Sequence, residues 1–257
     1  MCLTAQREFG AHPPTQIFDQ FDRSILTRGL NMLEAIRVLA PQLHWEVAAV
    51  AARQLFELVL NMEWLKSMPD REAASVQFAR FGMLQQVRAQ IDEQTYGLET
   101  GRKINEEQLQ LLKDFLSTSE FDEFRRPKAR EGWAESWNDQ NAWTMTKASE
   151  NEMRRPQYNQ LFKAWSREAH AAPGALIRTM MPGAILDTTT DLVTREVRDT
   201  ASILNMAVML FGELWMLLVN VPPMPLDAWN RWMKALHDYY AIGDYKPLVV
   251  GIADSTN

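Results

Sequence analysis

The chain has 257 residues and a mass of 29.6 kDa, which is enough to bury a sizeable core within one large domain. Its 27 lysines and arginines against 33 aspartates and glutamates give a net charge of −6. This balance argues against a broad phosphate-binding surface, which needs clustered positive charge. The single cysteine, Cys2, excludes an internal disulfide framework and a cysteine-based zinc site. Residues 1–14 lack a basic region followed by an apolar run, so we expect no secretory signal and a cytoplasmic protein.

Apolar residues recur every three to four positions through most of the chain, as they do on amphipathic helices. Prolines and capping residues delimit the predicted helices, which cover residues 17–40, 42–67, 70–96, 105–117, 190–220 and 225–240, with a further helix opened by Pro156. No segment shows the sustained alternation typical of strands. We therefore predict an all-α fold, a multi-helix bundle of about seven to nine helices. The predicted organisation is an N-terminal extension (1–15), a single helical domain (16–240) and a C-terminal tail (241–257).

One apolar stretch, residues 200–221, approaches membrane-spanning length. Glu213 lies in the middle of its apolar run, and a carboxylate at the centre of a bilayer is costly. We therefore interpret this stretch as a buried central helix and expect no stable membrane insertion. A transmembrane span is the alternative.

Three polar residues, Arg53, Glu57 and Asn61, follow one another at four-residue steps along an otherwise apolar helix. A charge that is buried in a central helix must be paired or neutralised. An ion pair that fixes the register of the helices explains this line of residues most simply. The alternative is a polar pocket inside the bundle, where facing helices commonly build sites.

Ser166 and His170 also lie four residues apart, on one face of the helix that Pro156 opens. A histidine near a helix end can interact with the last carbonyl groups, or it can act as a general acid or base near neutral pH. A metal site built from His44, His170 and His237 on three helices has no local support, since no paired-ligand spacing occurs. We therefore predict no metal and no cofactor.

Tryptophans are concentrated in the middle of the chain, where Trp133, Trp137 and Trp143 fall within eleven residues. We expect Trp133 and Trp137 to share one face of a helix. Core packing is the simplest role for these residues, and a wall of a ligand pocket is the alternative. The residues predicted to line such a pocket are Trp133, Trp137, Tyr158, Trp165 and Arg167.

The order of these motifs resembles a bacterial helical family known as domain-of-unknown-function family 5677. The resemblance covers roughly residues 36–181. It rests on the sequence from Arg53 to Glu57, the tryptophan-bearing segment, Tyr158, and the run from Trp165 to Pro173. The family implies no activity that can be carried over to this chain.

The window from Ser166 to His170 is more remotely similar to the HEPN superfamily, small helical bundles that include metal-independent ribonucleases of toxin–antitoxin and phage-defence systems. The signature of that superfamily is an arginine, a polar residue, three further residues and a histidine. In this chain Trp165 occupies the arginine position, so the resemblance implies that another cation, Arg53 oriented by Glu57, replaces it. The implied catalytic set is His170, Arg53, Glu57 and Ser166.

Two functions therefore remain open. One is a HEPN-like bundle that binds or cleaves RNA or a nucleotide, in which dimerisation brings two motifs together. The other is a non-catalytic helical protein that pairs with itself or with a protein partner, and whose buried polar residues are structural.

Overall fold

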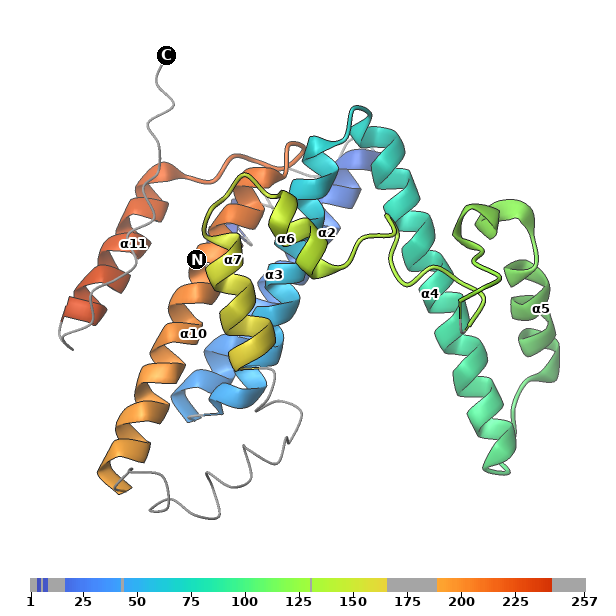
Figure 1. The fold of residues 1–257 in the computed structure, drawn as a ribbon, viewed down its shortest axis with the longest axis horizontal. Coiled ribbons are helices and arrows are strands. Elements are labelled where there is room, and N and C mark those ends of the chain that lie inside the picture. The colour runs from blue at the N-terminus through green and yellow to red at the C-terminus, as the bar shows by residue number, and fades with distance from the viewer. Residues whose placement is uncertain are drawn as a thin grey trace. The chain divides into compact units, whose positions relative to one another are not determined.

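The computed structural model describes residues 4–5, 7–8, 17–42, 44–129, 131–165 and 189–241. Two compact units make up the chain: unit 1 comprises residues 1–66 and 145–257, and unit 2 comprises residues 67–144. Each is described by itself. The helices, labelled in Figure 1, are α2 (Ile17–Leu39), α3 (Trp45–Ser67), α4 (Arg71–Glu99), α5 (Glu106–Leu116), α6 (Ala142–Ala148), α7 (Arg154–Tyr158), α10 (Thr189–Leu217) and α11 (Leu226–Ala241), with short 3₁₀-helices at Ala40–Gln42 and Ser119–Phe124.

The predicted all-α class is confirmed for the residues that the structure describes, which contain helices and a single isolated β-bridge. The predicted helix ends agree with the observed ones to within a few residues. The largest differences are three residues: α3 begins at Trp45 instead of residue 42, α4 ends at Glu99 instead of Tyr96, and α10 ends at Leu217 instead of residue 220. The predicted domain bounds, 16–240, stay a prediction.

Unit 1 is built around α2, α3 and α10, which meet at Gly29 of α2. A Cβ atom at Gly29 would lie 2.6 Å from Leu214 Cδ2 of α10 and 3.3 Å from Leu55 Cδ1 of α3. Glycine therefore allows these three helices to approach closely. The apolar faces that they bury explain why their sequences show a three-to-four periodicity. The fully buried apolar side chains of these helices include Leu26, Ile36, Leu55, Phe56, Leu60, Met62, Leu65, Phe211 and Trp215.

The last helix, α11, lies against α10 at a second glycine. A Cβ atom at Gly212 would lie 2.2 Å from the ring of Trp229, which is itself 3% exposed. The chain between the two helices is fixed by Trp215, whose indole Nε1 donates to the carbonyl oxygen of Pro222 at 2.8 Å. The buried carboxylate of Asp22 on α2 accepts from the backbone N–H of Asn220 at 2.9 Å.

Within the described part of the chain, one segment, Val197–Leu217 of α10, is long and apolar enough to cross a membrane by length and composition. Its mean hydropathy is 1.5, and 44% of the tested window is buried within the protein. The core helix of a soluble protein has the same properties. The segment also carries Glu213, which forms a buried ion pair.

Unit 2 contains α4, α5 and an irregular stretch that follows them. The predicted N-caps are confirmed: Asp70 accepts from the backbone N–H of Ala73, and Asn105 accepts from that of Gln108. Edge-to-face aromatic pairs hold the unit together, namely Phe78–Trp137, Phe81–Phe124 and Phe115–Phe121.

The prediction that Trp133 and Trp137 share a helical face is wrong. Trp133 pairs with Arg125 in an isolated antiparallel bridge, and the segment between η2 (the 3₁₀-helix Ser119–Phe124) and α6 is not helical in its described residues. Gly132 (φ +74°) and Asp139 (φ +54°) have left-handed backbone conformations, which a helix does not accommodate.

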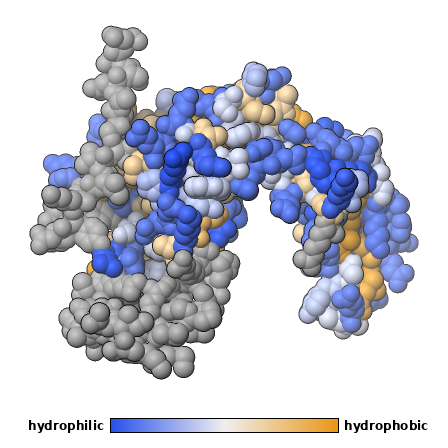
Figure 2. Space-filling view, in the orientation of Figure 1, coloured by the Kyte–Doolittle hydropathy of each residue, from blue (hydrophilic) through white to orange (hydrophobic). Residues whose placement is uncertain are grey.

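The surface of unit 2 carries exposed apolar side chains on both of its long helices. Figure 2 shows an apolar strip between hydrophilic residues on this unit. The exposed large apolar side chains of α4 and α5 are Val76, Met83, Tyr96, Leu98, Leu111 and Phe115.

The helix predicted to begin near Pro156 is confirmed as far as the structure describes it. It consists of α7 followed by a π-helix, η3 (Asn159–Ala164). The backbone N–H of Trp165 donates to the carbonyl oxygen of Gln160 at 2.9 Å, the five-residue hydrogen bond of a π-turn.

Candidate functional site

Arg53 and Glu57 of α3 form an ion pair within the helix. Arg53 Nε lies 3.2 Å from Glu57 Oε1, and the two side chains are 33% and 42% exposed. Asn61, the third member of the polar line, donates from Nδ2 to the carbonyl oxygen of Glu57 at 2.7 Å. These three residues therefore lie at the edge of unit 1 and interact with one another along α3.

Arg53 also contacts the π-helix. Its guanidinium carbon lies 4.0 Å from the ring centroid of Phe162, a cation–π distance. Phe162 stacks on Tyr158, with 4.6 Å between ring centroids and 9° between ring planes. Its other ring neighbour is the fully buried Phe56 of α3, which meets it edge to face at 6.1 Å and 63°. The structure thus brings Arg53, Glu57 and Tyr158 of the predicted set to one place.

The remaining predicted residues of unit 1 divide into two groups. Trp165 is 4% exposed and belongs to the core of unit 1. Ser166, Arg167 and His170 lie outside the described residues.

Trp133 and Trp137 belong to unit 2, where they have aromatic and cationic neighbours of their own. The ring of Trp133 lies 4.8 Å from the guanidinium of Arg125, and Trp137 is 4% exposed beside Phe78. Packing within unit 2 therefore accounts for the half-buried Trp133 and the buried Trp137.

The most deeply buried cation among the described residues of unit 1 was not predicted. Arg154, at the start of α7, is 1% exposed. Its Nε and Nη2 donate to the carboxylate of Glu63 on α3 at 2.9 and 2.5 Å, and its Nη1 donates to Glu213 of α10 at 2.6 Å. The same Nη1 donates to Gln157 at 2.7 Å, and Ser149 Oγ donates to Glu63 at 3.0 Å. We call Arg154, Glu63, Glu213 and Gln157 the ionic cluster.

The charges of the ionic cluster do not balance, because two carboxylates share one guanidinium. Burial lowers the pKa of Arg154, but the hydrogen bonds and negative charges of Glu63 and Glu213 outweigh it, so that the pKa is raised above its ordinary value. Burial also raises the pKa of Glu213, and the charge and hydrogen bond of Arg154 reverse this only in part. Glu213 is therefore the carboxylate that protonates more readily than an exposed glutamate.

The ionic cluster suits a structural role better than anion binding. Carboxylate and amide oxygens take hydrogen bonds from all three nitrogens of the Arg154 guanidinium, so a phosphate would have to displace a buried carboxylate. The cluster joins α3, α7 and α10, and it thereby holds the start of α7 and the π-helix on the bundle (Figure 1).

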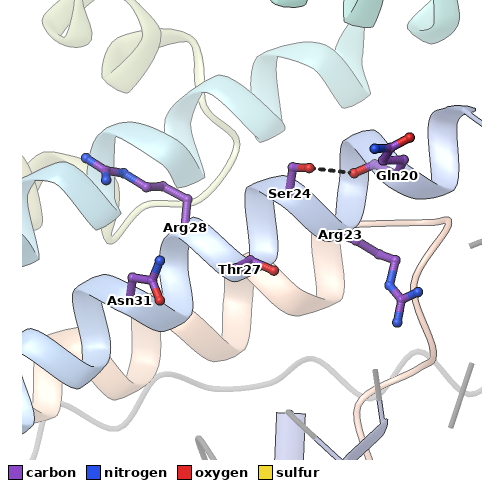
Figure 3. Close-up of a pocket in the computed structure, with 6 residues that line it drawn as sticks. All are labelled: Gln20, Arg23, Ser24, Thr27, Arg28 and Asn31. Carbon is purple, nitrogen blue, oxygen red and sulfur yellow. Dashed lines mark hydrogen bonds between the residues drawn. The ribbon is translucent and has the colours of Figure 1, made fainter. Parts of the chain in front are cut away.

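A separate polar hollow of about 470 Å³ lies along α2. All of its lining residues come from this one helix, and Figure 3 shows Arg23 and Arg28 pointing away from one another. Ser24 Oγ donates to the carbonyl oxygen of Gln20 on the same helix at 2.8 Å. Because its two cations diverge, this hollow does not form a convergent anion site.

No group of three or more histidine, cysteine, aspartate or glutamate side chains in the described ranges is placed to hold a metal ion. His237 is 64% exposed, and its Nδ1 lies 3.8 Å from Asp238 of the same helix. The metal alternative also included His44 and His170. Of these two, His170 lies outside the described ranges.

Two comparisons with known proteins found no match, because no curated protein and no solved structure is significantly similar to the chain. A model of the family of unknown function DUF5677 matches residues 23–182, which is more than half of the chain. The match confirms the resemblance to this family that the motifs predicted. The similarity to the HEPN superfamily stays a prediction.

Proposed function

The chain belongs to the family of unknown function DUF5677, and from this premise we propose that it is a HEPN-like helical protein that binds and cleaves RNA or a nucleotide. Arg53 holds the phosphate, Glu57 orients Arg53, and His170, with Ser166 beside it, transfers the proton. The proposed setting is the cytoplasm, in phage defence or a toxin–antitoxin system.

The observation that carries this proposal is the position of Arg53. Its guanidinium is partly exposed and is held in one orientation by Glu57 and by the ring of Phe162. Phe162 precedes Ser166 by four residues and His170 by eight. An arginine fixed beside the π-helix, which precedes His170 in the sequence, can supply the cation that Trp165 cannot.

The chemistry needs one base and one cation. The imidazole of His170 removes the proton of a ribose 2′-hydroxyl, whose oxygen attacks the adjacent phosphorus. The P–O5′ bond breaks, leaving a 2′,3′-cyclic phosphate; the leaving 5′-oxygen takes a proton from water, and the imidazolium of His170 returns its proton to solvent. Arg53 stabilises the negative charge that develops on the phosphate oxygens. No step in this sequence requires a redox change.

The test compares RNA cleavage and growth on expression for the wild type, His170→Ala and Arg53→Ala, with EDTA present in one arm. Arg37→Ala is the matched control, because Arg37 also pairs with a glutamate on its own helix, Glu34, but is 66% exposed on α2. We expect both site variants to lose cleavage and toxicity, and Arg37→Ala to keep them. Intact RNA in the wild-type reaction would overturn the ribonuclease proposal.

The second candidate is a non-catalytic helical protein that pairs with a second copy or a protein partner. The ionic cluster favours it, because Arg154, the most deeply buried cation of unit 1 in the described residues, is bound entirely by groups of the protein itself. Intact RNA combined with a stable dimer in sedimentation analysis would support this function over the first.

A further inference from the structure

Three planar groups lie in series where α3 meets the π-helix. The rings of Tyr158 and Phe162 are nearly parallel at 4.6 Å, and the Arg53 guanidinium lies 4.0 Å from the Phe162 centroid. All three side chains are half-buried, so part of each faces solvent. We call Tyr158, Phe162 and Arg53 the stacking platform.

The platform is fixed from the core side. Phe56 is fully buried and meets Phe162 edge to face, and Glu57 holds the Arg53 guanidinium through its Nε. The ionic cluster anchors Arg154 one turn before Tyr158. A set of planar groups that is held in this way loses little conformational entropy when a ligand binds.

The two aromatic groups of the platform lie in the π-helix or directly before it. Phe162 lies within η3, and Tyr158 is the residue before it. A π-turn interrupts the regular hydrogen-bond pattern of an α-helix, and such turns occur frequently at functional sites. Here the π-helix begins directly after Tyr158 and contains Phe162.

We propose that the stacking platform binds one nucleobase of a single-stranded nucleic acid, with the base against Tyr158 and another phosphate of the same strand at Arg53. Aromatic rings and guanidinium planes are the groups on which proteins stack unpaired bases. In this proposal a single cation, Arg53, neutralises one phosphate, and the chain as a whole carries a net charge of −6. The binding is therefore expected to depend only weakly on salt. The expected log–log slope is about −0.7, the contribution of one phosphate of a single strand. The inference rests on the proposed function, because it assumes that the ligand is a nucleic acid.

The experiment measures fluorescence anisotropy of a fluorescein-labelled 2′-O-methyl RNA ten-mer, which lacks the 2′-hydroxyl needed for cleavage. An abasic ten-mer carries the same phosphates without the bases. We expect wild-type protein to bind the first probe more tightly than the second. Equal binding of the two probes, or no binding of either, would overturn the platform.

Variants separate the two parts of the platform. Tyr158→Ala should weaken binding by about 5- to 150-fold, the range for one stacked base, whereas Tyr158→Phe should keep it. Arg53→Ala should weaken binding and flatten its salt dependence. Glu57→Gln should strengthen binding, because it removes a negative charge beside the phosphate. A merely structural role of Glu57 does not predict tighter binding.

The matched control is Tyr96→Ala in unit 2. Tyr96 also has an arginine over its ring, with Arg102 at 5.7 Å, and is 56% exposed. Its substitution should leave binding unchanged, and an equal loss from Tyr96→Ala and Tyr158→Ala would contradict the proposal. Cleavage that persists with unaltered binding in Tyr158→Ala would refute the platform and keep the proposed function. Base-dependent binding without cleavage or toxicity would support the platform and refute the proposed ribonuclease function.

Discussion

Arg154→Ala removes the guanidinium that Glu63 and Glu213 both bind, and it leaves two carboxylates facing each other inside unit 1. We expect a large loss of stability in unit 1 at neutral pH. Replacing a single partner of a buried ion pair costs about 3–5 kcal/mol, because a charge is left without compensation. This is a large share of the roughly 5–15 kcal/mol by which a folded protein is stable.

The structure favours the lower half of that range. Glu63 is 21% exposed and can turn towards water, and the raised pKa of Glu213 allows it to take up a proton. The loss should therefore be about 3–4 kcal/mol. Arg37→Ala gives the scale of an exposed pair, about 0–1 kcal/mol, since Arg37 is 66% exposed and its partner Glu34 is 44% exposed.

Hydrogen exchange measured by mass spectrometry suits this test, because a two-unit chain does not guarantee two-state unfolding. Peptides from α3 and α10 should lose protection in Arg154→Ala, and peptides from α4 should not. A triple variant with methionine at positions 63, 154 and 213 should recover most of the loss, since apolar residues of similar size commonly replace buried ion networks without cost. A triple variant as unstable as Arg154→Ala would refute the reasoning that unpaired charge causes the loss.

Three further predictions concern stability. The raised pKa of Glu213 means that the folded chain binds this proton more readily than the unfolded chain does, so the contribution of Glu213 to stability falls as pH rises above the ordinary pKa of a glutamate. Urea midpoints should therefore favour Glu213→Gln over wild type increasingly as pH rises above that ordinary value, and a difference that does not change with pH would contradict this. Gly212→Ala should lower the free energy of unfolding by about 1–3 kcal/mol, because the new methyl group pushes on the Trp229 ring. In a double-mutant cycle, the same substitution should destabilise the chain less when Trp229 is already replaced by alanine. Gly82→Ala lies at a helical position of α4, where nothing but the glycine's immediate neighbours and the nearby backbone of the helix itself comes within 4 Å of the new methyl group. It should stabilise unit 2 by about 0.5–1 kcal/mol in thermal unfolding, and a loss of stability would contradict this prediction.

The helices and their caps could be predicted because they depend on local sequence. Apolar periodicity located α2, α3 and α10, and Asp70 and Asn105 are the observed N-caps. The Arg53–Glu57 pair could also be predicted, because it depends on the four-residue spacing within one helix.

The ionic cluster could be predicted only in part. Glu213 stood out as a carboxylate in an apolar run, but its partner Arg154 is 59 residues away and lies beside a second arginine and a proline, a context typical of an exposed helix start. Glu63 is 91 residues from Arg154, and no local pattern joins them. The irregular path around Trp133 was missed for a similar reason, since the backbone there depends on Gly132 and on the packing of the nearby Trp137 against Phe78 of α4, which is distant in the sequence.

The spacing of the ionic cluster along the chain also has a consequence for biosynthesis. Unit 2 is continuous in sequence, and all of it is synthesised before Arg154. Arg154 is synthesised 91 residues after Glu63, and Glu213 follows after a further 59 residues. The synthesis of the whole interval from Glu63 to Glu213 takes roughly 8–30 s at the usual rates of translation. Unit 2 is therefore expected to fold first on the ribosome, while unit 1 reaches charge pairing across its three helices only when α10 has emerged.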